Sequence, residues 1–446
     1  MGIPAYILIA GTSSDRDRAG MLERAGYRCR IVPDGADPAN TIAEENPNVA
    51  FVGAADQSGL ETIRALKSGA ESRRIPLVAV DVGIAPDALR ACYEAGVDDI
   101  FEDDAEEAEI LARLVSLVRL SGMEAELLRR AATALDFGLS VSTEVEVSLP
   151  SDSFRLLVVG VEEDEFESMC PMLVKTGISY LAEPDPYRAR SRMEEDHGEE
   201  FAGALVYVKG GDAREKSEYF CHSVRNDRRL FDLPLFVVAE KGAFADPVEA
   251  YSQGASVVAH TPIDCDFVDV HLRMLLRGRE LRRVLGERIA AALGPESADR
   301  LGTVFSSEFM QAHLERIERD STKSGRQSTA VLFFVPTIGE VAALYGEDGA
   351  SRLRQQMADW LSGLVRIEDI VGRTGADEFL MLLPETSAVD ADRVRKRVIG
   401  VLHQSEFRLT DNVPVGVDVY VQSGLTTLQH GDTLENLVQR ASDGLE

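Results

Sequence analysis

Four charged residues close together in the chain have types and spacing that could bind a ligand or a metal ion. Arg366 and Asp369 stand three positions apart, and Asp377 and Glu378 follow in the run Gly375-Ala-Asp-Glu-Phe379. An arginine fork can make two charge-assisted hydrogen bonds at once, and carboxylate oxygens are common ligands of Mg²⁺. On spacing alone, Arg366 and Asp369 would be an ordinary salt bridge across a turn.

A β-hairpin is expected to position these residues. The apolar runs Asp369-Ile-Val-Gly-Arg373 and Leu380-Met-Leu-Leu-Pro384 lie on either side of a Thr-Gly turn. This pattern is typical of two antiparallel strands joined by a short connection. Asp369 would then start the first strand, and Asp377 and Glu378 would lie at the turn.

The two motifs at this spacing resemble the central hairpin of GGDEF domains, the diguanylate cyclase family, with its inhibitory R-x-x-D site just upstream. The run Asp299-Arg-Leu-Gly-Thr-Val-Phe-Ser-Ser307 aligns without gaps with the family's D-x-L-T-G-L-x-N-R opening, although only Asp299 and Leu301 are retained. The resemblance implies a degenerate GGDEF domain over residues 295–446. Its fold would be α/β, with a central antiparallel hairpin.

The same resemblance implies that the substrate and metal sites have been lost. The family's metal-binding D-x-D falls on Phe334 and Pro336, which carry no oxygen ligand for Mg²⁺. Its guanine-binding Asn and Asp fall on Ala342 and Ser351, and its second glycine on Ala376. We therefore expect no catalytic residues, no bound metal and no cofactor.

The R-x-x-D motif, in contrast, is intact. In the family it binds an intercalated dimer of cyclic di-GMP: the arginine meets a guanine edge or a phosphate, and the aspartate accepts from guanine N1 and N2. Counting from the hairpin places a further family arginine on Arg397, with Arg393 one turn away on the same helix face. The resemblance implies a ligand site of Arg366, Asp369, Arg397 and Arg393. Glu368 is expected to point to solvent.

The first 294 residues contain an internal repeat of about 150 residues. Short apolar runs such as Tyr6-Ile-Leu-Ile-Ala10 alternate with helical stretches, and Ile75-Pro-Leu-Val-Ala-Val80 matches Leu233-Pro-Leu-Phe-Val-Val238. Alternating strands and helices predict parallel sheets, and both copies resemble doubly wound (flavodoxin-like) receiver domains of response regulators. The expected division is a first pseudo-receiver domain with its C-terminal helix (1–137), a linker (138–152), a second pseudo-receiver domain with a connecting helix (153–294) and the GGDEF-type domain (295–446).

Phosphorylation of a receiver needs an aspartate at the end of the third strand. This position falls on Gly53 in the first copy and on Val208 in the second. The remaining positions of the receiver site also lack the required groups, and they fall on Gly11-Thr12, Asp81 and Asp103 in the first copy and on Gly160-Val161, Ala239 and Thr261 in the second. We expect both copies to serve packing and partner contact. Together with amphipathic helices expected at Ala105–Leu135 and Cys265–Leu293, they suggest a homodimer through the receivers, as in the family.

The bulk composition excludes several classes of partner. Forty-seven basic and 76 acidic residues give a net charge of −29, which repels nucleic acid and anionic membranes. The five cysteines are scattered without a C-x-x-C pair, which favours a reducing compartment and no metal cluster. No apolar run approaches the roughly 18 residues of a membrane helix. The expected location is the cytoplasm, with no membrane insertion.

Three functions are compatible with these residues. The first is a catalytically inactive cyclic di-GMP receptor that acts as a signalling adaptor; the second is a weak diguanylate cyclase that uses Asp377 and Glu378; the third is a scaffold that binds no nucleotide. We favour the first, because Arg366 and Asp369 remain while the substrate site is lost. The resemblance to inactive proteins of receiver–receiver–GGDEF architecture further implies a role at the bacterial cell pole in cell-cycle-regulated proteolysis, with RcdA and the ClpXP protease as partners.

Overall fold

The structure is a computed structural model, and its contacts divide the chain into two units. Unit 1 comprises Met1–Ser121 and Glu146–Arg283, and unit 2 comprises Gly122–Val145 and Val284–Glu446. The residues that the structure describes are 5–12, 14–33, 35–83, 85–102, 105–147, 155–171, 178–195, 201–227, 229–244, 247–409 and 416–445.

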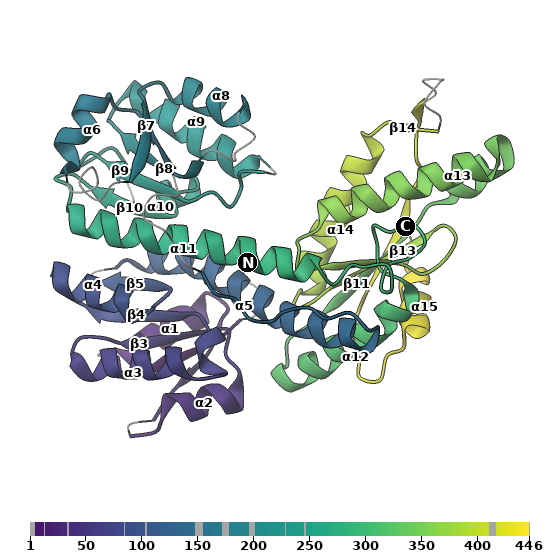
Figure 1. The fold of residues 1–446 in the computed structure, drawn as a ribbon, viewed down its shortest axis with the longest axis horizontal. Coiled ribbons are helices and arrows are strands. Elements are labelled where there is room, and N and C mark those ends of the chain that lie inside the picture. Colours follow the sequence, from purple (N-terminus) through teal and green to yellow (C-terminus); the bar gives the residue numbers. More distant parts are fainter. Residues whose placement is uncertain are drawn as a thin grey trace. The chain divides into compact units, whose positions relative to one another are not determined.

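Unit 1 contains two five-stranded sheets with the same topology (Figure 1). The first has the order β2-β1-β3-β4-β5 and all its strands are parallel. Its elements are β1 (Tyr6–Ala10), α1 (Asp15–Arg24), β2 (Arg28–Ile31), α2 (Pro38–Glu45), β3 (Val49–Gly53), α3 (Gln57–Ser68), a 3₁₀ turn (Ser72–Arg74), β4 (Leu77–Val82), α4 (Pro86–Glu94) and β5 (Asp99–Glu102), followed by the long helix α5 (Glu107–Asp136).

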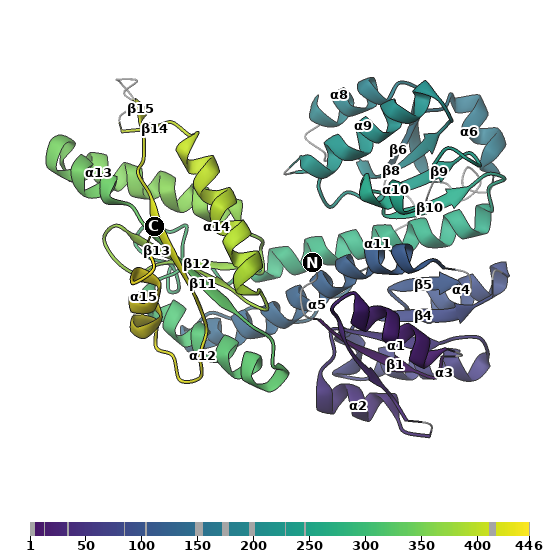
Figure 2. The same cartoon turned by 180° about the vertical axis from the view of Figure 1, so that it is seen from behind.

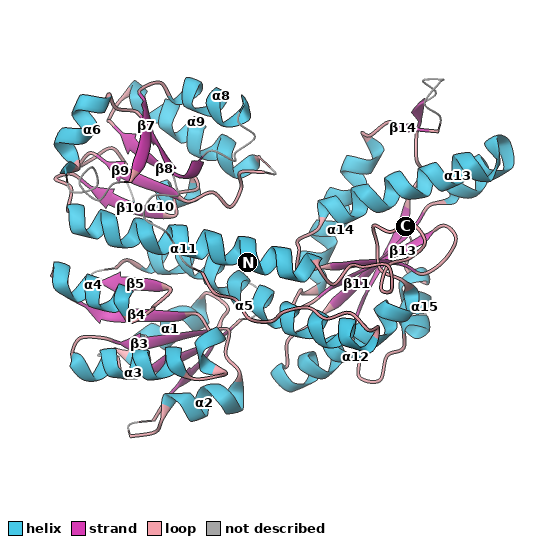
Figure 3. Cartoon of the chain, in the orientation of Figure 1, coloured by secondary structure: helices cyan, strands magenta, loops and turns pink. Residues whose placement is uncertain are grey.

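The second sheet, β10-β9-β8-β6-β7, repeats this order when it is followed from β7 (Figure 3). Its elements are β6 (Arg155–Val159), α6 (Glu163–Met169), β7 (Ser179–Glu183), α8 (Pro186–Glu195), β8 (Phe201–Val208), α9 (Asp212–Asn226), β9 (Leu235–Ala239), α10 (Pro247–Ser252), β10 (Val257–His260) and α11 (Cys265–Ala290). The predicted repeat of parallel α/β sheets is therefore confirmed, and the strand order is consistent with the flavodoxin-like type.

The central strands of both sheets are apolar and buried, whereas the edge strand β2 carries two arginines and is partly exposed. Every residue of β3 is buried, and β4 is buried throughout. Such continuous apolar runs are typical of parallel strands without a solvent face. The apolar runs Tyr6–Ala10 and Ile75–Val80, which the sequence predicts as strands, form β1 and most of β4 in this core.

Unit 2 is built on a four-stranded antiparallel sheet of order β12-β13-β11-β16 (Figure 2). Its elements are α12 (Ser307–Ser324), β11 (Thr329–Phe334), α13 (Pro336–Leu364, interrupted at Gly346), β12 (Ile370–Arg373), β13 (Glu378–Leu383), α14 (Ala388–His403), the short pair β14 (Phe407–Arg408) and β15 (Gly416–Val417), β16 (Gln422–Thr427) and α15 (Leu434–Ser442). The predicted hairpin is confirmed: β12 and β13 pair antiparallel, with Ile370 opposite Leu382 and Arg373 opposite Phe379.

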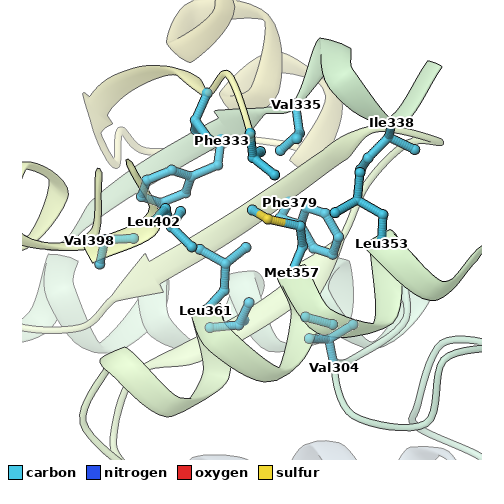
Figure 4. Packing of buried hydrophobic residues seen from close by; sticks show 14 of the residues in the cluster. Val304, Phe333, Val335, Ile338, Leu353, Met357, Leu361, Phe379, Val398 and Leu402 are labelled. Atoms are coloured by element: carbon cyan, nitrogen blue, oxygen red, sulfur yellow. The ribbon is translucent and has the colours of Figure 1, made fainter. Parts of the chain in front are cut away.

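Helices cover both faces of this sheet. On one face, Phe333 and Phe379 from the strands pack with Met357 of α13 and with Val398 and Leu402 of α14 (Figure 4). On the other face, the sheet packs with α12 and α15, and the buried residues include Phe309, Leu332, Ile370, Leu382 and Leu437. The hairpin strands are therefore fixed from both sides.

Part of the segment expected to link the two repeats packs into unit 2. Phe137, Leu139 and Val141 alternate with exposed residues and lie against the α12 side of the core. The ring of Phe137 is 5.2 Å from that of Phe309. Phe137 belongs to the turn that ends α5, and Leu139 and Val141 follow two residues apart; all three side chains are partly buried. The boundaries 1–137, 138–152, 153–294 and 295–446 stay predictions, and residues 148–154 lie outside the described residues.

In the part of the chain that the structure describes, no helix combines the length and the apolar character needed to cross a membrane.

The position of the receiver phosphoacceptor is closed by close backbone packing. A Cβ atom on Gly53 would lie 2.0 Å from the carbonyl oxygen of Gly11, whereas a Cβ atom on Gly83 would meet no atom within 4 Å. We expect Gly53→Ala to destabilise the first sheet by about 1–3 kcal/mol, because the tight contact between β1 and β3 would have to open. Gly83→Ala is the matched control and should change stability by less than about 0.5 kcal/mol. Native-state hydrogen exchange of the β1 and β3 amides measures both, and equal protection in the two variants would contradict this packing argument.

Candidate functional site

The R-x-x-D motif forms a tight turn between α13 and β12. The amide of Asp369 donates to the carbonyl of Arg366 at 3.1 Å, and the amide of Arg366 donates to the Asp369 carboxylate at 3.0 Å. Asp369 thus holds the turn closed with its backbone and its side chain, while the side chain of Arg366 is exposed. The exposed guanidinium is available for an external partner.

The carboxyl group of Asp369 is almost completely buried, with 9% of the residue exposed. Burial raises its pKa to about 7, and the neighbouring carboxylate of Glu368 adds to this shift. Arg366 and Arg130 act in the opposite direction and favour the charged form. Asp369 is therefore poised between its protonated and ionised states near neutral pH.

Glu368 differs from its expected orientation. The residue is only partly exposed, and its Oε2 atom is buried. The expectation that it points to solvent was wrong, because the turn directs residue 368 beside Asp369 rather than outward. Substitution of Glu368 would consequently change the electrostatic environment of the Asp369 carboxylate.

Arg397 lies beside the turn. Its Nη2 atom donates to the carbonyl of Leu364 at 2.9 Å, at the C-terminal end of α13 and two residues before Arg366. Arg393 lies one turn earlier on α14, is exposed, and pairs with Asp390 at 2.9 Å. The structure therefore brings Arg366, Asp369 and Arg397 to one edge of the domain, while Arg393 is engaged by its own helix.

An additional arginine reaches the turn from α5. The Nη2 atom of Arg130 donates to the carbonyl of Asp369 at 2.6 Å, and its Nε atom donates to the buried Glu126 at 2.6 Å. Sequence reasoning missed this residue. The available signal was the spacing of Glu126 with Arg129 and Arg130 on the helix, which permits three- and four-residue ion pairs but identifies no distant partner.

The hairpin turn at the other end of β12 carries the second motif. Phe334, the last residue of β11, lies opposite Glu378, and the Val335 amide donates to the carbonyl of Asp377 at 2.9 Å. Pro336 begins α13 directly afterwards. The residues aligned with the family's D-x-D are thus adjacent to Asp377 and Glu378, but they bring an aromatic ring and a pyrrolidine ring to this place.

An arginine faces the remaining carboxylate of this turn. Arg354 of α13 donates from Nε to the carbonyl of Ala376 at 3.0 Å, and its Nη2 atom is 3.9 Å from Asp377 Oδ1. The same guanidinium pairs with Glu347. Among the described residues, no group of three or more His, Cys, Asp or Glu side chains could hold a metal ion.

The opening motif of the third domain is tied to the same hairpin. Arg373 pairs with Asp299 at 2.8 Å, and its Nε atom donates to the carbonyl of Gly375 at 2.8 Å. Asp299, the retained acidic residue of the run 299–307, therefore has a structural partner on β12.

Comparison with known proteins identifies this domain. Residues 296–446 match the family model described as "Diguanylate cyclase, GGDEF domain". The C-terminal domain is a GGDEF domain. The response regulator PleD of Caulobacter vibrioides is 22% identical over 94% of this chain and 91% of its own length, so the relationship extends across the receiver-like part.

Two further comparisons concern the GGDEF domain alone. The diguanylate cyclase TpbB of Pseudomonas aeruginosa is 30% identical, covering 32% of this chain and 33% of TpbB. The solved GGDEF domain of TpbB shares 26% identity, covers 32% of this chain and 84% of its own, and gives a TM-score of 0.30. The GGDEF domain of DgcB from Caulobacter crescentus, solved with c-di-GMP, shares 13% identity, covers 34% and 85% of the two chains, and gives 0.32.

The receiver-like sites have structural contacts of their own. Gly53 and Val208 end β3 and β8 as predicted. Asp56 caps α3 by accepting from the Gly59 amide at 3.0 Å, and Asp81 pairs with Arg18 at 3.0 Å. Asp103 lies outside the described residues.

The raised pKa of Asp369 predicts a specific pH dependence of stability. Between its ordinary value of 3.8 and about 7, the folded state holds a proton that the unfolded state has released, so stability should fall as pH rises through this window. The slope is at most about 1.4 kcal/mol per pH unit. Asp369→Asn keeps an acceptor oxygen but cannot ionise, and it should become progressively more stable than wild type from pH 5 to pH 8.

Urea unfolding followed by fluorescence of Trp360 measures this difference. This residue is the only tryptophan of the chain and lies in α13, so its signal reports on unit 2. Stability profiles that stay parallel over pH 5–8 would show that Asp369 titrates normally.

Proposed function

We propose that the protein is a catalytically inactive cyclic di-GMP receptor that acts as a signalling adaptor, similar to the protein PopA. The observation that carries this proposal is the edge formed by Arg366, Asp369 and Arg397. An exposed arginine, a buried carboxylate and a second exposed arginine meet there within one domain. A domain related to diguanylate cyclases supplies the class of ligand.

The chemistry of the ligand fits these groups. Cyclic di-GMP carries two phosphate charges, and the protein carries −29, so long-range attraction is absent and local geometry must supply affinity. Arginine forks can bind a guanine O6/N7 edge or a phosphate with two hydrogen bonds. The ionised Asp369 can accept from the N1 and N2 hydrogens of guanine, which fixes the orientation of the base.

A weak diguanylate cyclase is the second candidate, because Asp377 and Glu378 remain. Synthesis would require Mg²⁺ to neutralise the triphosphate and activate the attacking hydroxyl. Phe334 and Pro336 stand where further ligands are needed, and Arg354 already faces Asp377. These residues do not fit a catalytic metal centre, so we favour the receptor.

The wider role is proposed by resemblance to PopA. The two receiver-like domains would act as docking surfaces and join two copies into a homodimer. Through RcdA, the protein would deliver substrates to the ClpXP protease at the cell pole, as part of cell-cycle control in the cytoplasm. A scaffold that binds no nucleotide would share this architecture, and ligand binding distinguishes the two.

Substitutions at the proposed edge should weaken binding in a defined pattern. Arg366→Lys should lose almost as much affinity as Arg366→Ala, because an ammonium group cannot reproduce the planar fork. Asp369→Asn places a donor toward guanine donors and should cost about 1–3 kcal/mol, roughly ten- to hundred-fold in affinity. Arg397→Ala should also weaken binding. Calorimetric titration with cyclic di-GMP measures all four variants.

Lys396→Ala is the control for Arg397→Ala. Lys396 is the adjacent residue on α14, is exposed, and pairs with Asp392 at 2.7 Å. Its substitution should leave the affinity within about two-fold of wild type. If wild type binds and all the variants bind equally well, the ligand site lies elsewhere; if wild type itself does not bind, the nucleotide-independent scaffold is favoured.

Turnover gives an independent test. We predict no formation of cyclic di-GMP from GTP with either Mg²⁺ or Mn²⁺, because the residues at 334 and 336 provide no metal ligands. Product analysis by chromatography on wild type and Asp377→Ala measures this. Product that appears with wild type and disappears with Asp377→Ala would establish the weak cyclase instead.

A further inference from the structure

A buried charge cluster connects α5 with the R-x-x-D turn. Glu126 has no exposed surface, and its Oε1 atom accepts from Arg130 Nε at 2.6 Å. The same guanidinium donates from Nη2 to the carbonyl of Asp369 at 2.6 Å. One arginine therefore spans a buried carboxylate on α5 and the backbone of the turn, and all three residues belong to unit 2.

Further partners fix the position of Glu126. Its Oε2 atom accepts from Arg129 Nε at 3.0 Å, and Arg129 also pairs with Asp320 of α12 at 3.2 Å. His313 Nε2 lies 3.2 Å from Glu126 Oε1, and its Nδ1 is 3.0 Å from the hydroxyl of Thr133. Burial alone would raise the pKa of Glu126, but His313, Arg130 and Arg129 outweigh it and hold the pKa well below its ordinary value. Glu126 is a permanent anion that anchors Arg130.

An aromatic ring also packs against the guanidinium group of Arg130. Its guanidinium lies over the ring of Phe305 at 5.5 Å. The backbone of Phe305 pairs with β12, since its amide donates to Val371 at 3.0 Å and its carbonyl accepts from Arg373 at 3.1 Å. Arg130 therefore packs against a segment that is itself registered to the strand following Asp369. Few alternative positions remain for its two donor groups.

We propose that Arg130 is a positioning residue of the cyclic di-GMP site, so that helix α5 takes part in a site whose contact residues all come from the GGDEF domain. This inference rests on the proposed function. Arg130 does not contact the ligand in this proposal. It holds the carbonyl of Asp369, and the carboxylate of Asp369 in turn closes the turn that presents Arg366.

A purely structural role predicts a different result. Arg316 of α12 offers a comparison, because its guanidinium attaches α5 to the domain at another place. Its Nη2 atom donates to Asp136 at 2.8 Å and to the carbonyl of Ala132 at 3.2 Å, and these contacts do not involve the turn. If Arg130 only attaches α5 to the domain, its loss should affect binding no more than the loss of Arg316.

The experiment compares Arg130→Met, Arg130→Lys and Arg316→Met in the full chain by calorimetric titration with cyclic di-GMP. We expect Arg130→Met to weaken binding on the order of ten- to hundred-fold, because small displacements of binding groups are costly. Arg130→Lys should weaken binding several-fold, since one ammonium group cannot serve both Glu126 and the carbonyl. Arg316→Met should bind within about two-fold of wild type.

The pH dependence of binding gives a second measurement, and a simple loss of stability would not change its midpoint. The charged groups that act on Asp369 are Glu368, Arg366 and Arg130, and burial raises its pKa to about 7. Binding that needs the carboxylate should weaken as pH falls from 8 to 6. Removal of the Arg130 charge should shift the midpoint of this profile to higher pH, whereas Arg130→Lys and Arg316→Met should leave it unchanged.

The outcomes separate this inference from the proposed function. Absence of binding to wild type would refute the proposed function itself. Binding to wild type with equal affinity for folded Arg130→Met would overturn the positioning role alone, and so would equal losses in Arg130→Met and Arg316→Met. If Arg130→Met does not fold, Arg130→Lys decides, because wild-type affinity in that variant would also overturn the role.

Discussion

The neutralisation of Glu126 is the constraint on which unit 2 depends. A carboxylate without exposed surface is tolerated only where cations and hydrogen-bond donors surround it, and removal of one partner of such a pair is strongly destabilising. Here Arg129, Arg130 and His313 meet this need from two helices. These contacts fix the position of α5 relative to α12. The apolar residues after α5, from Phe137 to Val141, pack against the same side of the core.

The pKa values of two buried carboxylates in this region are shifted in opposite directions. Glu126 has three positive or donor partners and stays ionised, whereas the buried carboxylate of Asp369 has one backbone donor and a neighbouring carboxylate. Burial, with a smaller contribution from Glu368, therefore raises the pKa of Asp369 to about 7. Arg130 lies between them: its Nε atom donates to the carboxylate of Glu126, whereas its Nη2 atom donates to the backbone carbonyl of Asp369. In the proposed receptor, it is the ionised form of this carboxylate that would accept hydrogen bonds from guanine.

Sequence patterns predicted the parts of this molecule that depend on local periodicity. Continuous apolar runs identified β1 and β4, and the two runs around the Thr-Gly turn identified β12 and β13. The place of Arg397 beside the turn was also obtained by counting along the chain, although its role as a ligand contact stays a prediction. The role of Arg130 could not be obtained in this way, because its partner Asp369 lies 239 positions further along the chain. Glu368 was misplaced for a related reason: the conformation of a turn, rather than the residue type, decides which side chains face inward.

The two motifs of the GGDEF domain lie at opposite ends of one short strand. Asp369 immediately precedes β12, and the Gly375–Phe379 run follows Thr374 at the other end, so a strand of four residues, roughly 13 Å long, lies between the two sites. At the first end, Arg130 of α5 donates to the carbonyl of Asp369, and Arg397 of α14 donates to the nearby carbonyl of Leu364. At the second end, the contacts come from Val335, which follows β11, and from Arg354 of α13. Because the contacts at the two ends are made by different residues, a change at position 334, 336 or 376 would not directly remove a contact of the R-x-x-D turn.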